Sequence, residues 1–128
     1  MRSIEEAVAW GEAQAKHPSQ DWSGMCESFT RQCLGLPAYA ASAKIAAEKV
    51  PADQRHTSTP PPRGAMVFFE AIGGQYGHAV LSIGGGKVLS TDYCVKGHVC
   101  EAAWDLPNWH ATKGAWFWTM WTPFGVIK

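Results

Sequence analysis

The sequence lacks any excess of charge of one sign. Its 128 residues include 11 lysines and arginines and 11 aspartates and glutamates, so the formal net charge is zero at pH 7. Each half of the chain is balanced as well, because residues 1–64 carry seven basic and seven acidic side chains and residues 65–128 carry four of each. Binding to nucleic acid or to an anionic membrane usually requires a basic patch. We therefore expect neither as a partner.

A long hydrophobic run is also missing. The two longest uncharged stretches, 71–86 and 114–127, are interrupted by Gly, His, Ser or Trp. Both are shorter than the ~20 apolar residues that cross a bilayer. The segment Met1–Trp10 is acidic and amphipathic, unlike the basic and then apolar start of a secretory signal. These observations predict a chain that has no membrane span and that is either made in the cytoplasm or has lost a leader.

The four cysteines do not have the paired spacing of a zinc or redox motif. Cys94, His98 and Cys100 lie close together, but no fourth zinc ligand is evident. A disulfide between Cys94 and Cys100 is favoured over zinc, and two free thiols are favoured over both. Cys33 lies seven residues after Cys26 on a predicted helix, too far to bridge to it, and is assigned to the core. We expect no metal and no cofactor.

Helical patterns fill the first part of the chain. Ser3 and Glu6 form a capping box that predicts a helix over 4–16. A second helix, capped by Ser23, is predicted to start after Gly24 and to end at Gly35. A third candidate covers 38–50. The segment 51–63 contains three consecutive prolines and is predicted to be an exposed connection.

Strand patterns follow the proline-rich segment. The clearest is a hairpin whose strands are joined through Gly84–Gly86. The predicted strands cover 65–69, 78–83, 88–93, 98–103 and 115–121. Helices followed by strands predict an α+β fold in which the N-terminal helices pack on a mostly antiparallel sheet. At this length we expect one domain over residues 1–128 and a monomer.

Cys26 is the first candidate for chemistry. In the first turn of a helix, its thiol would face the positive end of the helix dipole and unpaired N–H groups, which favour thiolate. The same N–H groups could hold an oxyanion. His78, which follows Gly77 and opens a strand, is the candidate base. The alternative interpretation is that both are buried, inert core residues.

A third catalytic residue follows from the register of the hairpin. If the turn is centred on Gly85, the numbers of opposed residues sum to 170, which places His78 opposite Asp92. A carboxylate there could accept the imidazole N–H and fix the tautomer. Ser90, on the same face, is the second choice. Glu101 and Asp105 are more distant candidates.

Three segments in order resemble the papain-fold cell-wall peptidases of the NlpC type and their CHAP relatives. They are DWSGMCESFTR, PPRGAMVFF and YGHAVLSIGGGKVLSTD, and they fall within residues 21–92. The resemblance implies a papain-like fold with Cys26 as nucleophile, His78 as base and Asp92 or Ser90 in the third position. Two departures from the NlpC pattern concern substrate preference more than the Cys-His chemistry. They are Met25-Cys26-Glu27 in place of Asp-Cys-Ser, and Gly64-Ala65 in place of Gly-Asp.

The resemblance further implies hydrolysis of an amide bond in bacterial peptidoglycan through a thioester, by a cysteine endopeptidase or an N-acetylmuramoyl-L-alanine amidase such as a phage endolysin or a bacterial lysin. Trp22 would line the cleft and offer its indole N–H to the oxyanion, beside the backbone N–H of Cys26. Trp104 and Trp109, in loop-like sequence, are candidates for contacting glycan, and Ser90 is a further candidate for substrate binding.

Two other functions remain open. The same Cys26 and His78 could serve a thiol acyltransferase or an amidase that acts on another substrate. Alternatively, the chain could be a non-catalytic module that binds a glycan or a partner protein. No GxSxG, HExxH or paired-carboxylate motif supports a serine esterase, a zinc protease or a glycosidase.

Overall fold

A computed structural model describes residues 2–71, 76–106, 112–119, 121–122 and 125–126. The helices are α1 (Ile4–Lys16), α2 (Cys26–Leu34), α3 (Ala43–Glu48) and a 3₁₀ turn, Ala52–Gln54. The strands are β1 (Met66–Ala71), β2 (His78–Gly84), β3 (Lys87–Thr91), β4 (Val99–Ala103), β5 (Thr112–Thr119), β6 (Trp121–Thr122) and β7 (Gly125–Val126). The prediction of an α+β fold with a mostly antiparallel sheet is therefore confirmed.

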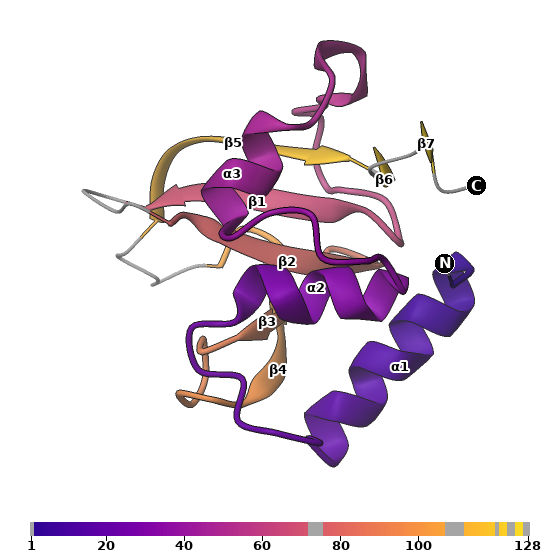
Figure 1. The fold of residues 1–128 in the computed structure, drawn as a ribbon, viewed down its shortest axis with the longest axis vertical. Coiled ribbons are helices and arrows are strands. Elements are labelled where there is room, and N and C mark those ends of the chain that lie inside the picture. The colour runs from indigo at the N-terminus through magenta and orange to yellow at the C-terminus, as the bar shows by residue number, and fades with distance from the viewer. Residues whose placement is uncertain (1, 72–75, 107–111, 120, 123–124, 127–128) are drawn as a thin grey trace.

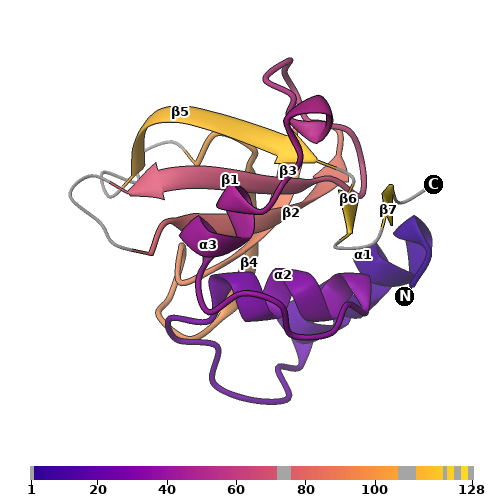
Figure 2. The ribbon, with the colours of Figure 1, turned by 45° about the horizontal axis from the view of Figure 1, so that its top comes forward.

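The strands β1 to β5 form one sheet in the order β4-β3-β2-β1-β5, and β6 pairs with β7 (Figure 1). The pairings within the larger sheet are antiparallel. The three helices lie on one face of this sheet (Figure 2). None of the helices among the described residues is long and apolar enough to cross a membrane.

Local signals account for most of the helix boundaries. The predicted capping box of Ser3 and Glu6 starts α1. Gly35 ends α2 with a left-handed φ of 73°, which glycine adopts at little cost. The predicted cap of α2 is wrong, because the Ser23 hydroxyl donates to Asp21 instead. The third helix is shorter than predicted, since Ser42 caps it by accepting from the amide of Ile45.

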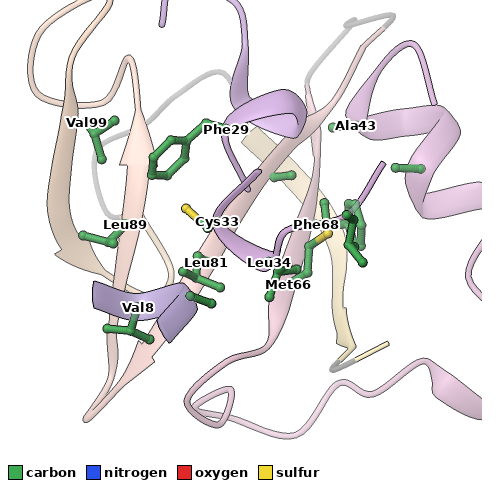
Figure 3. Packing of buried hydrophobic residues seen from close by; sticks show 14 of the residues in the cluster. Val8, Phe29, Cys33, Leu34, Ala43, Met66, Phe68, Leu81, Leu89 and Val99 are labelled. Carbon is green, nitrogen blue, oxygen red and sulfur yellow. The ribbon is translucent and has the colours of Figure 1, made fainter. Parts of the chain in front are cut away.

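The core between the helices and the sheet, which we call the helix-side cluster, holds the largest set of buried apolar side chains (Figure 3). Labelled members include Val8, Phe29, Leu34, Met66, Leu81 and Leu89. A second set, the outer cluster, covers the other face and comprises Val67, Phe69, Val80, Val88, Ala102 and Leu106. Successive strand residues point to opposite faces. Along β2, Ala79 and Leu81 therefore face the helices, and His78 and Val80 face away from them.

The hairpin of β2 and β3 has the predicted register over most of its ladder. Leu81 pairs with Leu89 and Ser82 with Val88, and both sums equal 170. The register shifts at the turn, where Gly84 rather than Ile83 pairs with Lys87. Gly84 has a positive φ of 81°, as do the two glycines that follow it at 62° and 76°, which is the conformation that such a turn requires.

Candidate active site

Cys26 is the first residue of α2, and its thiol lies where the helix meets β2. The sulfur packs against the helix-side cluster, and the backbone amides of Ala79 and Glu27 donate toward it. Burial raises the pKa of the Cys26 thiol, and the carboxylates of Glu27 and Asp92 add to the rise, while the two amides oppose it. The thiol form is therefore favoured in the resting protein.

His78 is the first residue of β2, and its side chain is buried, with 4% of its surface exposed. Its Nε2 lies 2.9 Å from the hydroxyl oxygen of Ser90. That hydroxyl donates its one proton to the carbonyl of Thr91, at 3.1 Å. The Ser90 oxygen must then accept from His78, which places the ring proton on Nε2 and leaves Nδ1 as the basic nitrogen. Burial lowers the pKa of His78 to about 3, so the imidazole is neutral at pH 7.

The two candidates approach the same peptide bond of β2 from different sides. The Cys26 sulfur faces the amide of Ala79, the residue directly after His78, from the helix side. The His78 ring lies with the outer cluster, 6.4 Å from the ring of Phe69 between centroids. Sequence positions 52 residues apart are therefore brought to one end of β2.

Asp92 does not occupy the predicted third position. Its backbone leaves the strand with a φ of 59°, in the left-handed region. One carboxylate oxygen accepts from the amide of Gly24 at 2.8 Å, and the other accepts from the amide of Gly97 at 2.6 Å. The group that contacts His78 is Ser90, the diagonal neighbour on the same face of the hairpin, so the assignment of Asp92 is corrected in favour of Ser90.

The structure also corrects the expectations for Trp22 and Ser90 as substrate contacts. Trp22 is fully buried, and its indole N–H donates to Gln14 at 3.1 Å. It can neither line an open cleft nor donate to an oxyanion. Ser90 is also fully buried, which suits a partner of His78 and not a surface contact.

Four predicted residues remain. Trp104 is half-buried and packs against the outer cluster. Trp109 lies outside the described residues. Glu101 and Asp105, the distant alternatives for the third position, are both exposed.

Cys94 and Cys100 form a disulfide, which corrects the expectation of two free thiols. Their sequence separation of six residues closes the short loop between β3 and β4. Cys33 is a free, buried cysteine, as predicted, and burial raises the pKa of its thiol. Within the described ranges, no group of three or more His, Cys, Asp or Glu side chains could hold a metal ion.

Sequence reasoning missed the buried carboxyl of Glu27, beside Cys26. Glu27 is buried, burial raises its pKa, and its Oε1 lies 4.0 Å from the Nε of Arg31. Helical spacing carried a signal for this pair, because residues i and i+4 share one face of a helix. The spacing could not reveal that this face is covered, because covering depends on tertiary packing.

No protein-family model matches the chain, and no curated protein matches it significantly. Any assignment of function therefore rests on the residues and geometry described above.

Proposed function

We propose that this chain is a papain-like cysteine hydrolase that cleaves an amide bond of bacterial peptidoglycan. In this proposal Cys26 is the nucleophile, His78 the base and Ser90 the residue that orients the imidazole. The observation that carries the proposal is the position of the Cys26 thiol, at the start of α2 and against the backbone amide of the residue after His78. His78 is buried, and its Nδ1 is the basic nitrogen. A nucleophile, a base and a group that orients the base together form the minimal set for acyl transfer.

The proposed reaction begins with the resting pair as a thiol and a neutral imidazole. The mechanism requires the two side chains to meet around the end of β2, so that the Cys26 proton passes to Nδ1 of His78 as the sulfur attacks the amide carbon. The thiolate then forms only when substrate is present. Backbone N–H groups of the first turn of α2 would hold the oxyanion, because a helix leaves these groups without partners of its own. The His78 imidazolium then protonates the departing amine, and a thioester remains on Cys26.

Water completes the cycle. His78 removes a proton from water as the oxygen attacks the thioester, and the second tetrahedral intermediate expels the Cys26 sulfur. The sulfur regains its proton from the imidazole, and the acyl group leaves as a carboxylic acid. With Trp22 buried, the proposal assigns the oxyanion to backbone groups alone.

Support for peptidoglycan as the substrate comes from the order of the three segments that resemble NlpC and CHAP peptidases. Three features occur in the same order as in those peptidases. They are a cysteine at a helix start, a strand after Pro-Pro-Arg-Gly and a Gly-His at the start of β2. The zero net charge agrees with a substrate other than nucleic acid.

The test is cleavage of purified peptidoglycan, with mass spectrometry of the fragments released. Cys26→Ala and His78→Ala should each abolish release of fragments while circular dichroism stays unchanged. Cys33→Ala, which removes the other free thiol, is the matched control and should keep activity. Fragment release at the normal rate by Cys26→Ala would refute the mechanism.

A second experiment tests whether the thiol and the imidazole can meet. The reagent 1,3-dibromoacetone joins a thiol and an imidazole only when they are neighbours. It should cross-link Cys26 to His78, as identified by peptide mapping. Alkylation of Cys26 without attachment to His78 would contradict the proposed pairing. Binding of peptidoglycan without release of fragments would favour a non-catalytic module, and transfer of the acyl group to an added amine in preference to water would favour an acyltransferase.

A further inference from the structure

The loop between β3 and β4, residues 92–98, is fastened to the turn that precedes Cys26. The carbonyl of Gly97 accepts from the amide of Trp22 at 2.9 Å. The Asp92 carboxylate accepts from the amides of both Gly24 and Gly97. One side chain thus joins the loop to residue 24, two positions before the nucleophile.

The fit between the loop and this turn is close. A Cβ atom added to Gly97, whose φ is 83°, would lie 2.3 Å from a carboxylate oxygen of Asp21 and 2.9 Å from the hydroxyl of Ser23. Both distances are shorter than atoms tolerate without a shift. The loop and residues 21–24 are therefore in direct van der Waals contact, so a displacement of one segment requires a displacement of the other.

The Cys94–Cys100 disulfide joins the interior of the same loop to β4. Cys94 follows Asp92 by two residues and is exposed. Cys100 pairs with Ser90 across the ladder of β3 and β4. The disulfide therefore ties a residue two positions from Asp92 to the strand position opposite the partner of His78.

We infer that the disulfide-closed 92–98 loop is a redox-sensitive clamp that positions Cys26 relative to His78, and that its reduction by a dithiol slows the reaction. The inference rests on the proposed function. In the oxidised protein, Asp92 and Gly97 hold the turn before α2 in place. In the reduced protein the loop gains conformational freedom, and ordering it again costs free energy in every catalytic cycle.

The chemical step is ordinary thiol–disulfide exchange. A thiolate of the dithiol attacks one sulfur of the Cys94–Cys100 bond and forms a mixed disulfide, releasing the other cysteine as a thiolate that takes up a proton. The second thiol of the reagent then attacks the mixed disulfide. Two electrons pass to the protein, which gains two cysteine thiols, while the dithiol becomes a cyclic disulfide. The exposure of Cys94 gives the reagent access.

The experiment compares the full chain before and after treatment with dithiothreitol, with the excess reagent removed under nitrogen. Release of amino groups from peptidoglycan should fall about tenfold in kcat with little change in KM, because a displaced nucleophile impairs attack and not binding. Reoxidation should restore the rate. Cys94→Ser/Cys100→Ser should be slow whether or not dithiothreitol is added, and Cys33→Ala should respond as the wild type does.

Asp92 supplies a test that does not use the disulfide. Asp92→Asn keeps a residue that tolerates the left-handed conformation and keeps one carbonyl acceptor, whereas Asp92→Ala keeps neither. In the oxidised protein, kcat should therefore fall in the order wild type, Asp92→Asn, Asp92→Ala, again with little change in KM. Equal kcat for Asp92→Ala and wild type would overturn the clamp.

Hydrogen exchange separates this inference from the proposed function. Reduction should speed amide exchange in residues 21–26 and 92–98 and leave α1 protected. Equal rates of catalysis in the oxidised and reduced proteins, or unchanged exchange in those two segments, would overturn the inference while leaving the Cys26 mechanism intact. Loss of protection throughout α1 would also overturn it, since the disulfide would then hold the whole fold. Absence of cleavage by the oxidised protein would refute the proposed function, and the exchange data would still decide the clamp.

Discussion

Replacing Ser90 with alanine tests the assignment of the orienting residue most directly. The Ser90 hydroxyl is the acceptor that fixes the His78 tautomer, at 2.9 Å from Nε2. Alanine would leave the Nε2–H of a buried imidazole without this acceptor, which costs about 1–3 kcal/mol. The imidazole could lower that cost by moving its proton to Nδ1, and the nitrogen that should receive the thiol proton would then be blocked.

The expected effect on rate follows from this free energy. Since ~1.4 kcal/mol corresponds to tenfold in rate, a penalty of that size predicts a fall in kcat of roughly tenfold to a hundredfold. The assay is release of fragments from peptidoglycan at pH 7, with thermal unfolding followed in parallel. Ser90→Thr, which keeps a hydroxyl group, should recover much of the lost activity.

The neighbouring residue provides a matched control. Thr91 is fully buried, and among the described residues its hydroxyl oxygen has no hydrogen-bond partner. Thr91→Val removes a hydroxyl from the same strand, with its side chain on the opposite face, so it should leave kcat unchanged and raise the free energy of unfolding by about 1 kcal/mol. If Ser90→Ala were as active as Thr91→Val, Ser90 would have no part in orienting His78.

Three further predictions concern pH and packing. Because the pKa of His78 is near 3 in the folded protein and near 6.5 when unfolded, the unfolded state binds more protons between these values. The free energy of unfolding should therefore fall by ~1.4 kcal/mol per pH unit as the pH drops from about 6.5 to about 3, and His78→Gln should flatten this dependence in acid-titrated urea melts. The raised pKa of the Cys26 thiol predicts that iodoacetamide labels it slowly at pH 7 and faster above pH 9; rapid labelling at neutral pH would contradict a resting thiol. Gln14→Leu removes the acceptor for the Trp22 indole N–H, so it should lower the free energy of unfolding by about 1–3 kcal/mol in urea titration. The value of kcat should not change. Lost turnover in a folded protein would indicate a catalytic role for Trp22.

Local signals predicted much of the fold because they act over a few residues. The capping box of Ser3 and Glu6 and the left-handed Gly35 are set by neighbours along the chain, and both were predicted correctly. The three glycines at 84–86 likewise predicted the turn and the register of its hairpin. One helix prediction failed because a side chain had two local partners to choose from. Ser23 could cap α2 or bond to Asp21, and it bonds to Asp21.

The contact between His78 and Ser90 was predicted in part for the same reason. Alternation along β3 puts Ser90 and Asp92 on one face, so sequence spacing limited the partner of His78 to a short list. Which of these two residues contacts His78 depended on where β3 ends. Asp92 turns out of β3 with a positive φ and bonds to two amides, one of them 68 residues away in sequence. No pattern within the hairpin contains that information.

The sequence by itself determined the order of helices and strands, the hairpin register and the placement of a cysteine at a helix start, since each depends on propensity or spacing over a few residues. Only the tertiary structure decided that Trp22 is buried, that Ser90 contacts His78 and that Cys94 is bonded to Cys100. These outcomes depend on which distant segments pack together, because burial and side-chain pairing follow from contacts that chain-local patterns do not specify.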